Sequence, residues 1–454
     1  AASIAVLPFV NLSEDHANEY FGDGLAEELS SVLSRVPDLK VAARTSAFAF
    51  KGQSVSVSEI GEALNVATVL EGSVRKSGDR VRITAQLINV SDGFHLWSDS
   101  YDRDLTDILA IQAEISRAIV DALEVRLTSD VDAELARPVT RNVDAYNDYL
   151  RGRHFWNRRS LAAFDSAIQY FNRAVLLDPD YARAYAALAE TFVLLPEYGG
   201  FSIPEALPYA KAATERALAL DPDLAEAYAA SGYLKNVFEW DWVGAERDYL
   251  KAIKLDPDYA TAHQWYAELL CILRRWDEAL AQARTAYELD PLAPAPALVY
   301  GVTLRFTGQL DDALAHFRTG LERAPDLLQA LRHLAFTYIA KGDHESAAAS
   351  FERLAAVHGS DPEVYRAYLA AVADSTRVPA AVEALRTSRV YGLIAKTEYL
   401  ASLGQLEETL AALEQAYEER EPYLPWVNAA PQYEEMRSDP RFQSFLRKIG
   451  FEAP

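Results

Sequence analysis

The first residues that could do chemistry are the glycines of Gly22-Asp23-Gly24, which precede an apolar helical pattern. Glycines at the start of a helix can form a phosphate cradle, because backbone N–H groups then point at the anion. Here the third glycine of that motif is absent, and Glu27 and Glu28 follow in the first turn, where carboxylates would repel a phosphate. We therefore expect a helix that starts at Gly24 and is stabilised by its own acidic residues.

A second candidate is an acidic run before a later helical segment, made of Asp99, Asp102, Asp104 and Asp107. Such a run could hold a cation or a polyamine, but the interpretation we favour is a solvated turn with a helix cap. The eight histidines are scattered, and the sequence has no His-Glu-x-x-His, Gly-x-Ser-x-Gly, Walker or kinase motif. The sequence therefore predicts no catalytic residues, no metal site and no cofactor.

The charge of the chain limits its partners. Lysine and arginine total 44 against 67 acidic residues, which gives a net charge of -23. Nonspecific binding to nucleic acid is disfavoured, because both carry negative charge. The same charge speeds encounter with basic partners, so we expect a protein or peptide partner with basic character. Homodimer formation is left open.

The cysteine content and the first residues of the chain are the features that could indicate its cellular location. Cys271 is the only cysteine, so no intrachain disulfide forms, and its apolar neighbours indicate a packing role. No run approaches the roughly 18 apolar residues of a membrane span. A strand-like run starts at Ser3 without an initiator methionine. We expect that an upstream signal peptide, tag or anchored domain was removed, and we favour a periplasmic over a cytoplasmic location.

The elements that position side chains in most of the chain are repeats. The tripeptide Leu-Asp-Pro recurs, ending at Pro179, Pro222, Pro257 and Pro291, with weaker copies at Pro325 and Pro362. Twelve residues before these prolines, or in the same phase, stand Ala167, Ala210, Ala245, Ala279, Ala313 and Ala347. Ten residues after them stand Ala189, Gly232, Ala267, Gly301 and Ala335. Small residues in this phase predict helix hairpins whose two helices cross closely there.

On these residues the chain resembles the tetratricopeptide repeat family. Tyr185, Leu188, Ala189 and Phe192 fit the first half of its pattern, and Ala167, Phe171 and Ala174 fit the second. The resemblance implies an all-α superhelical solenoid over 144–425 with about seven or eight repeats, and a C-terminal capping segment over 426–454. The copy near 363–390 is degenerate, because Val372 stands where a small residue belongs.

Before residue 130 the pattern changes to alternating strands and helices, which predicts an α/β domain with a mixed sheet. We expect strands over 3–10 and 39–43, helices over 24–33 and 58–64, a hairpin turning at 76–79, a strand over 94–100 and a helix over 107–127.

Four segments of this domain, starting at Ser3, Gly22, Leu70 and Trp97, make it resemble the amino-terminal domain of TolB and its FlgO-type relatives. That resemblance implies a binding module over 1–130, joined to the repeats by a linker over 131–143. Such modules occur in bacterial signalling proteins with an upstream adenylate cyclase, kinase or DNA-binding domain.

Two features inside the array remain open. The segment 196–205 lengthens one repeat and is either a tolerated insertion or a functional loop. The tryptophans Trp240 and Trp242 lie so close together that both cannot face one helix interior. A partly exposed aromatic patch is therefore one expectation there.

Ligands of the repeat family usually bind the concave groove formed by the first helix of each repeat. The phase of the prolines assigns to that face ten residues, which we call the groove set: Arg183, Glu190, Glu226, Tyr233, Asn236, Gln264, Glu268, Arg305, Gln329 and Arg332. Their mixed charge departs from the lysine and asparagine clamp that binds a terminal carboxylate in this family.

We expect a non-catalytic scaffold that binds a protein or peptide through the groove set. The alternative is the periplasmic ligand-sensing region of a membrane-anchored regulator, resembling adenylate cyclase-linked or CadC-type receptors, whose output domain is not in this chain. A membrane-spanning helix encoded just before Ala1 would favour the alternative.

Overall fold

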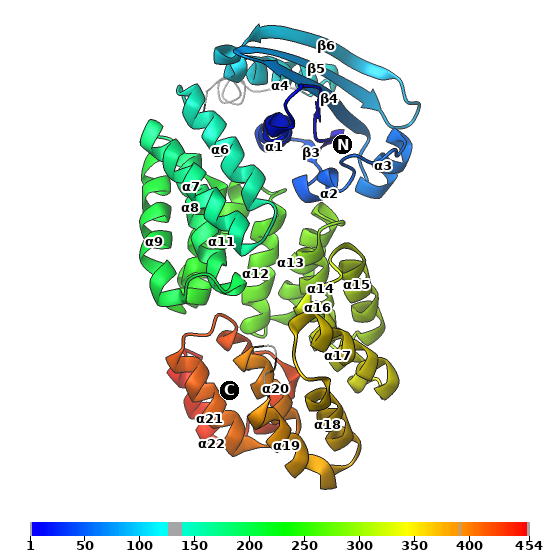
Figure 1. Ribbon diagram of the computed structural model, residues 1–454, viewed down its shortest axis with the longest axis vertical. Coiled ribbons are helices and arrows are strands. Elements are labelled where there is room, and N and C mark those ends of the chain that lie inside the picture. Colours follow the sequence, from blue (N-terminus) through cyan, green and yellow to red (C-terminus); the bar gives the residue numbers. More distant parts are fainter. Residues whose placement is uncertain (1, 126–138, 389, 391, 452–454) are drawn as a thin grey trace. The chain divides into compact units, whose positions relative to one another are not determined.

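The structure is a computed structural model, and it describes residues 2–125, 139–388, 390 and 392–451. The chain falls into two compact units (Figure 1). Unit 1 comprises residues 1–234, 247–262 and 289–291, and unit 2 comprises residues 235–246, 263–288 and 292–454.

The amino-terminal part of unit 1 is an α/β domain on one mixed sheet, as the sequence predicts. The strand order is β3-β1-β4-β5-β6, with β2 also pairing with β4. The β3, β1 and β4 strands are parallel, and β4, β5 and β6 are antiparallel. The strands are β1 (Ala2–Val6), β2 (Val10–Asn11), β3 (Leu39–Val41), β4 (Thr68–Ser77), β5 (Arg80–Asn89) and β6 (His95–Asp104).

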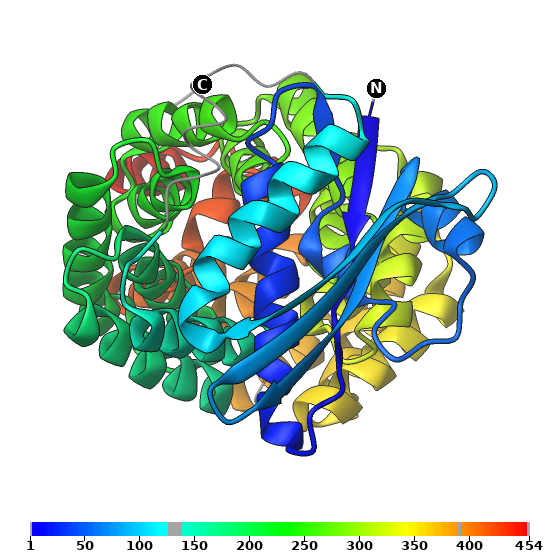
Figure 2. The same ribbon diagram turned by 90° about the horizontal axis from the view of Figure 1, so that it is seen from above.

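Two helices lie against one face of this sheet, α1 (Glu19–Leu33) and α4 (Ile108–Ala122). The helices α2 (Arg44–Phe48) and α3 (Val57–Leu64) contact β1 and β4, where consecutive residues are buried on both faces. Figure 2 shows α1 and α4 side by side across the sheet. Val81, Ile83 and Leu87 of β5 are fully buried beneath them. The alternate residues of β5, such as Arg80 and Thr84, lie on the uncovered face, as a half-buried antiparallel sheet requires.

Several predicted boundaries in this domain are wrong. The strand expected over 3–10 is divided into β1 and β2 around Pro8, because proline cannot donate to the ladder. The strand expected over 94–100 continues to Asp104. The last helix ends at Ala122, and the expected linker over 131–143 lies largely outside the described residues.

Eight helix pairs follow in the described residues, in line with the predicted solenoid. The first four are α6 (Val143–Trp156) with α7 (Leu161–Leu177), α8 (Ala182–Leu194) with α9 (Ile203–Leu220), α10 (Ala225–Tyr233) with α11 (Trp242–Leu255), and α12 (Ala260–Ile272) with α13 (Trp276–Leu289). The others are α14 (Pro294–Phe306) with α15 (Leu310–Arg323), α16 (Leu328–Ala340) with α17 (His344–His358), α18 (Pro362–Ala373) with α19 (Val378–Thr387), and α20 (Leu393–Ser402) with α21 (Leu406–Glu418).

The small residues lie where the paired helices cross. A Cβ atom added to Gly152 would lie 2.4 Å from the Phe171 ring, and one on Gly301 would lie 2.7 Å from the Phe317 ring. The six phased alanines are completely buried. The predicted packing of the hairpins is therefore confirmed. Cys271 is also buried, with its Sγ 3.2 Å from Thr303 Oγ1, which confirms its packing role.

The C-terminal segment of unit 2 contains η6 (Leu424–Asn428), η7 (Pro431–Met436) and α22 (Pro440–Lys448). It packs with α20 and α21, and it also covers Trp240 and Trp242. The Trp242 ring stacks on Phe451 at 4.9 Å, and Trp242 Nε1 donates to Gly450 O at 3.2 Å. The C-terminal segment thus covers Trp240 and Trp242 in part, and both tryptophans stay half-buried, so the partly exposed aromatic patch expected there is smaller than two free rings would make it.

No helix in the described part of the chain has the length and apolar character needed to cross a bilayer.

Candidate functional site: a buried polar network in unit 1

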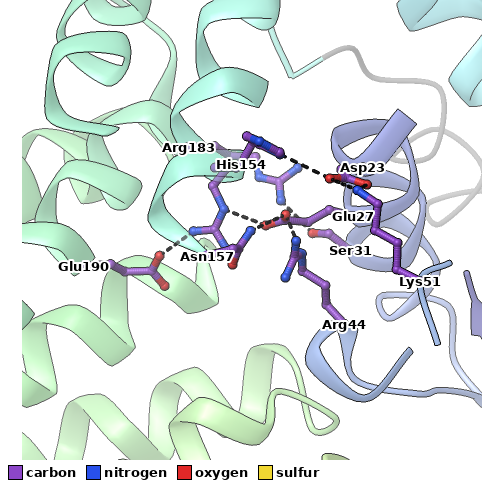
Figure 3. A network of polar contacts seen from close by, with 10 residues as sticks. Asp23, Glu27, Ser31, Arg44, Lys51, His154, Asn157, Arg183 and Glu190 are labelled. Carbon is purple, nitrogen blue, oxygen red and sulfur yellow. Dashed lines mark hydrogen bonds and ion pairs between the residues drawn. The ribbon is translucent and has the colours of Figure 1, made fainter. Parts of the chain in front are cut away.

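A network of buried charges joins α1 of the α/β domain to the first helices of the array (Figure 3). Its centre is Glu27 on α1. Arg153 Nε of α6 donates to Glu27 Oε1 at 2.6 Å, and Asn157 Nδ2 donates to Oε2 at 3.0 Å. Arg44 Nε of α2 forms an ion pair with the same Oε2 at 2.7 Å. Burial alone would raise the pKa of Glu27, but Arg153 and Arg44 outweigh it and lower that pKa to about 2.

Arg153 extends the network to Glu190 of α8, which also binds Tyr259, the residue before α12. Its Nη1 donates to Glu190 Oε2 on α8 at 2.8 Å, and Tyr259 Oη donates to Glu190 Oε1 at 2.8 Å. Arg153 thus lies between two carboxylates that come from different parts of the chain. A guanidinium satisfies both because its N–H groups form a planar fork.

Two further groups of contacts flank this centre. Lys51 Nζ donates to both Asp23 oxygens at 2.7 Å, and His154 Nδ1 lies 3.1 Å from Asp23 Oδ2. Burial opposes ionisation of Asp23, but these two hydrogen bonds outweigh it and lower its pKa. On the other side, Arg183 donates to Glu28 Oε2 at 2.5 Å and to Ser31 Oγ at 2.7 Å. Burial raises the pKa of Glu28, which Arg183 offsets only in part.

The glycines of α1 allow this close approach. The helix begins at Glu19, so Gly22, Gly24, Glu27 and Glu28 lie inside it, and the predicted helix start at Gly24 is wrong. A Cβ on Gly24 would lie 2.8 Å from Leu150 of α6, and a Cβ on Gly22 would lie 2.5 Å from the Phe9 carbonyl oxygen. The glycines are therefore needed for packing against α6 and against the backbone of Phe9 between β1 and β2, and the acidic residues are needed for ion pairs.

Two aspartates of the Leu-Asp-Pro signature also contact the α/β domain. Asp256 Oδ2 accepts from Ser34 Oγ at 3.0 Å. Asp290 Oδ1 accepts from Ser46 N at 2.9 Å and from Ser46 Oγ at 2.5 Å. Burial is the main cause that raises the pKa of each carboxyl to about 6. The signature aspartates therefore have a second role besides helix punctuation.

The pKa of Asp290 predicts a pH dependence of stability. Because the folded chain binds this proton more tightly than the unfolded chain, the free energy of unfolding falls as the pH rises through about 6. Between pH 5 and 7.5 the loss is about 1.4 kcal/mol for this group. Asp290→Asn keeps an acceptor for Ser46 and should remove the loss. Urea titrations at pH 5 and pH 7.5 give the free energies of unfolding of the original chain and of Asp290→Asn. If the two chains differ by the same amount at both pH values, the prediction is wrong.

The network binds helices to one another through its charges. Its carboxylates on α1 and α8 accept from guanidinium, ammonium, amide or tyrosine groups, and its cations come from α2, α6, α8 and Lys51, which follows α2. In the described residues, no three histidine, cysteine, aspartate or glutamate side chains are grouped so as to hold a metal ion.

The structure places four members of the groove set in unit 1. Arg183 and Glu190 belong to the network, and Glu226 Oε1 lies 3.6 Å from Arg183 Nη2. Tyr233 hydrogen-bonds to Glu197 of the 196–205 segment. These four residues come from α8 and α10; Arg183 contacts Glu226 and α1, whereas Glu190 contacts Arg153 of α6 and Tyr259.

The other six members lie in unit 2. Gln264 donates to Glu268 at 3.0 Å, and both are half-buried. Gln329 donates to Tyr423 at 2.5 Å, and Arg332 pairs with Glu398. Arg305 lies 3.4 Å from His333 Nδ1, and Asn236 is buried. Whether these residues bind a ligand stays a prediction.

Sequence reasoning missed Arg153, although a signal for it exists. Arg153 follows the small residue Gly152, just as Glu190 follows Ala189 and Glu268 follows Ala267. The first repeat has no Leu-Asp-Pro before its first helix, and a longer loop separates its two helices. The groove set was assigned by counting forward from the Leu-Asp-Pro prolines, so Arg153 was not assigned to it. Glu27 carried no such signal, because its partners are distant in sequence.

The acidic run does not form the predicted turn. Asp99, Asp102 and Asp104 lie on β6, and Asp102 pairs with Arg80 at 2.6 Å and with Arg82 at 2.5 Å across the strands. The aspartates are neighbours in sequence, but alternate residues of a strand point to opposite faces of the sheet. Asp107 precedes α4 without a side-chain capping bond.

Comparison with known proteins finds tetratricopeptide repeats in this chain, since repeat models match residues 248–281 and 304–371. Over 187 residues it is 40% identical to "Putative adenylate cyclase 3" of Rhizobium meliloti (strain 1021), a match to 41% of this chain and 32% of that protein. Over 211 residues it is 26% identical to "Transcriptional regulator HilA" of Salmonella typhimurium, a match to 45% of this chain and 37% of that protein.

The chain thus spans about a third of the length of these relatives. Among solved structures, the type IV pilus biogenesis factor PilW is similar, with a TM-score of 0.38 and 19% identity over 47% of this chain and 92% of that one.

Proposed function

We propose that the chain is a non-catalytic scaffold whose repeat array recognises protein segments through the groove set. The observation that carries this proposal is the contact of Arg183 with α1. This member of the groove set binds Glu28 and Ser31 of a helix far away in sequence. One residue predicted to line the binding face of the array is thus in contact with a helix of the same chain, which supports a role of that face in protein recognition, as in other repeat proteins.

In unit 2 the groove set is proposed to bind a second protein or peptide. Gln264, Glu268 and Gln329 are its half-buried members, whereas Arg305 and Arg332 are buried. The Glu268 carboxylate adds negative charge to a face of a chain whose net charge is -23. Both features favour a partner with basic residues, which long-range attraction would steer towards this chain.

Selection of random peptides on the intact chain tests this proposal. The selected peptides should be enriched in lysine and arginine, and Glu268→Lys should weaken their binding about tenfold, or about 1.4 kcal/mol. Glu322→Lys makes the same charge change at an exposed position of α15 and should leave binding unchanged. Equal binding to both variants, or no enrichment of basic residues, would contradict the proposal.

The domain organisation is part of the proposal. We propose that the mixed sheet and its helices form a TolB-like module over 1–130. The four segments that resemble TolB support this assignment. A linker over 131–143, a repeat array over 144–425 and a capping segment over 426–454 complete it. The stacking of Trp242 on Phe451 supports a capping role for this last segment.

A second candidate function is the ligand-sensing region of a membrane-anchored bacterial regulator in the periplasm. It is supported by the names of the relatives, because one is called a cyclase and the other a transcriptional regulator. Similarity to proteins whose names indicate different outputs fits a sensory or assembly part. An alkaline phosphatase fused to this chain in its native gene should be active if the location is periplasmic, and an inactive fusion would contradict it.

A further inference from the structure

The β6 strand is an open edge of the sheet. In the described residues it pairs with β5 alone. Leu105 N donates to Asp79 O at 2.7 Å, which sets the alternation of backbone groups along the strand. By this alternation Tyr101 directs its backbone groups to β5, whereas Ser98, Ser100, Asp102 and Asp104 direct theirs away from the sheet. An edge of this kind is a template for a further strand.

The side chains of β6 are arranged symmetrically about Tyr101. Asp99 and Arg103 flank it at equal spacing on the helix-covered face, where Tyr101 lies opposite Ile83. Asp99 and Arg103 are both exposed, although Tyr101 between them is 7% exposed. Arg103 also lies 3.7 Å from Glu114 of α4.

We propose that β6 pairs with β6 of a second copy of this chain, antiparallel and centred on Tyr101. In that register Asp99 lies opposite Arg103 of the second copy, and Arg103 lies opposite Asp99 of the second copy. Ser100 lies opposite Asp102 and Ser98 opposite Asp104, so no like charges face each other. Opposite charges directly across a strand pair stabilise it.

Neighbouring registers lack this complementarity. A pair centred on Asp99 or on Asp102 would place two aspartates opposite each other, and a pair centred on Arg103 would place two arginines opposite each other. A shift by one residue between the chains would direct the helix-covered face of one copy to the uncovered face of the other. The Tyr101 register also places Trp97 opposite Leu105 of the second copy, and both are half-buried in a single chain.

The charges of an edge strand can also serve to prevent pairing. Charges that only prevent strand pairing need no symmetric arrangement, whereas the proposed dimer requires opposite charges placed symmetrically about Tyr101. An exchange of charges therefore distinguishes a dimer interface from a protected edge, and it also distinguishes a second copy from a different protein strand.

Sedimentation of the full chain over a range of concentrations tests the proposal. The original chain should dimerise reversibly. Asp99→Arg alone and Arg103→Asp alone should each weaken the dimer at least tenfold, because each places like charges opposite one another twice. A mixture of the two single variants should form a heterodimer as tightly as the original, and the double variant should dimerise again.

Two further variants keep the test independent of folding. Ser100→Pro removes an outward N–H group without changing charge, and an edge strand tolerates proline at such a position. It should abolish the dimer at an unchanged melting temperature. Glu14→Arg makes the same charge change as Asp99→Arg at an exposed position away from β6 and should leave the dimer intact. An original chain that is monomeric throughout, or a mixture no tighter than the single variants, would overturn the proposal.

Discussion

Replacing Glu27 with glutamine should destabilise unit 1 by about 3 to 5 kcal/mol, which is the usual consequence of removing one partner of a buried ion pair. Arg153 and Arg44 would then be buried beside a neutral amide, with Glu190 as the remaining carboxylate of Arg153. Urea titration followed by hydrogen exchange of α1 and α6 peptides reports on unit 1 separately from unit 2.

Glu19→Gln is the matched control, because Glu19 is on the same helix and its pair with Lys51 is solvent-exposed. Exposed ion pairs contribute roughly 0 to 1 kcal/mol, so this variant should change little. A Glu27→Gln chain as stable as the Glu19→Gln chain would show that the network does not hold α1.

The second large effect is expected in the array. Gly301→Trp should lower the melting temperature of unit 2 by roughly 6 to 12 °C, because the Phe317 ring occupies the space of even a Cβ atom. Overpacking a core by such a side chain costs up to about 3 kcal/mol, and each kcal/mol shifts the transition of a unit this size by about 2 to 4 °C.

Ala315→Trp provides the comparison, since Ala315 lies on the exposed side of α15 in the same helix pair. Calorimetry should show the melting temperature of the original chain for Ala315→Trp and a lower one for Gly301→Trp. If Gly301→Trp melts at the original temperature, the proposed helix crossing at the small residues is wrong.

The sequence predicted the features that arise from local periodicity. Alanines and glycines in a fixed phase identified the helix crossings, because only small residues let two backbones approach there. Val81, Ile83 and Leu87 alternate with polar residues and so identified the covered face of β5. The turn at Gly78-Asp79 was predicted for a similar reason, since Gly78 adopts a positive φ of 58° that glycine accepts readily.

The features that the sequence did not predict depend on contacts between distant residues. Glu27 contacts Arg153, which is 126 positions away, and Arg183 contacts Glu28, which is 155 positions away. No local spacing distinguishes these carboxylates from acidic residues that stabilise a helix start. The contact of the C-terminal segment with Trp242 was missed for the same reason, because Gly450 lies 208 positions away in sequence.

A double-mutant cycle on Glu27 and Arg153 tests most directly whether the first repeats hold the α/β domain through buried ion pairs. The free energy of unfolding is measured for the original chain, for Glu27→Gln, for Arg153→Met and for the double variant. A direct buried contact predicts that the effects of the two single changes are not additive, with a coupling energy of about 2 kcal/mol or more. A coupling energy below about 0.5 kcal/mol would contradict the account.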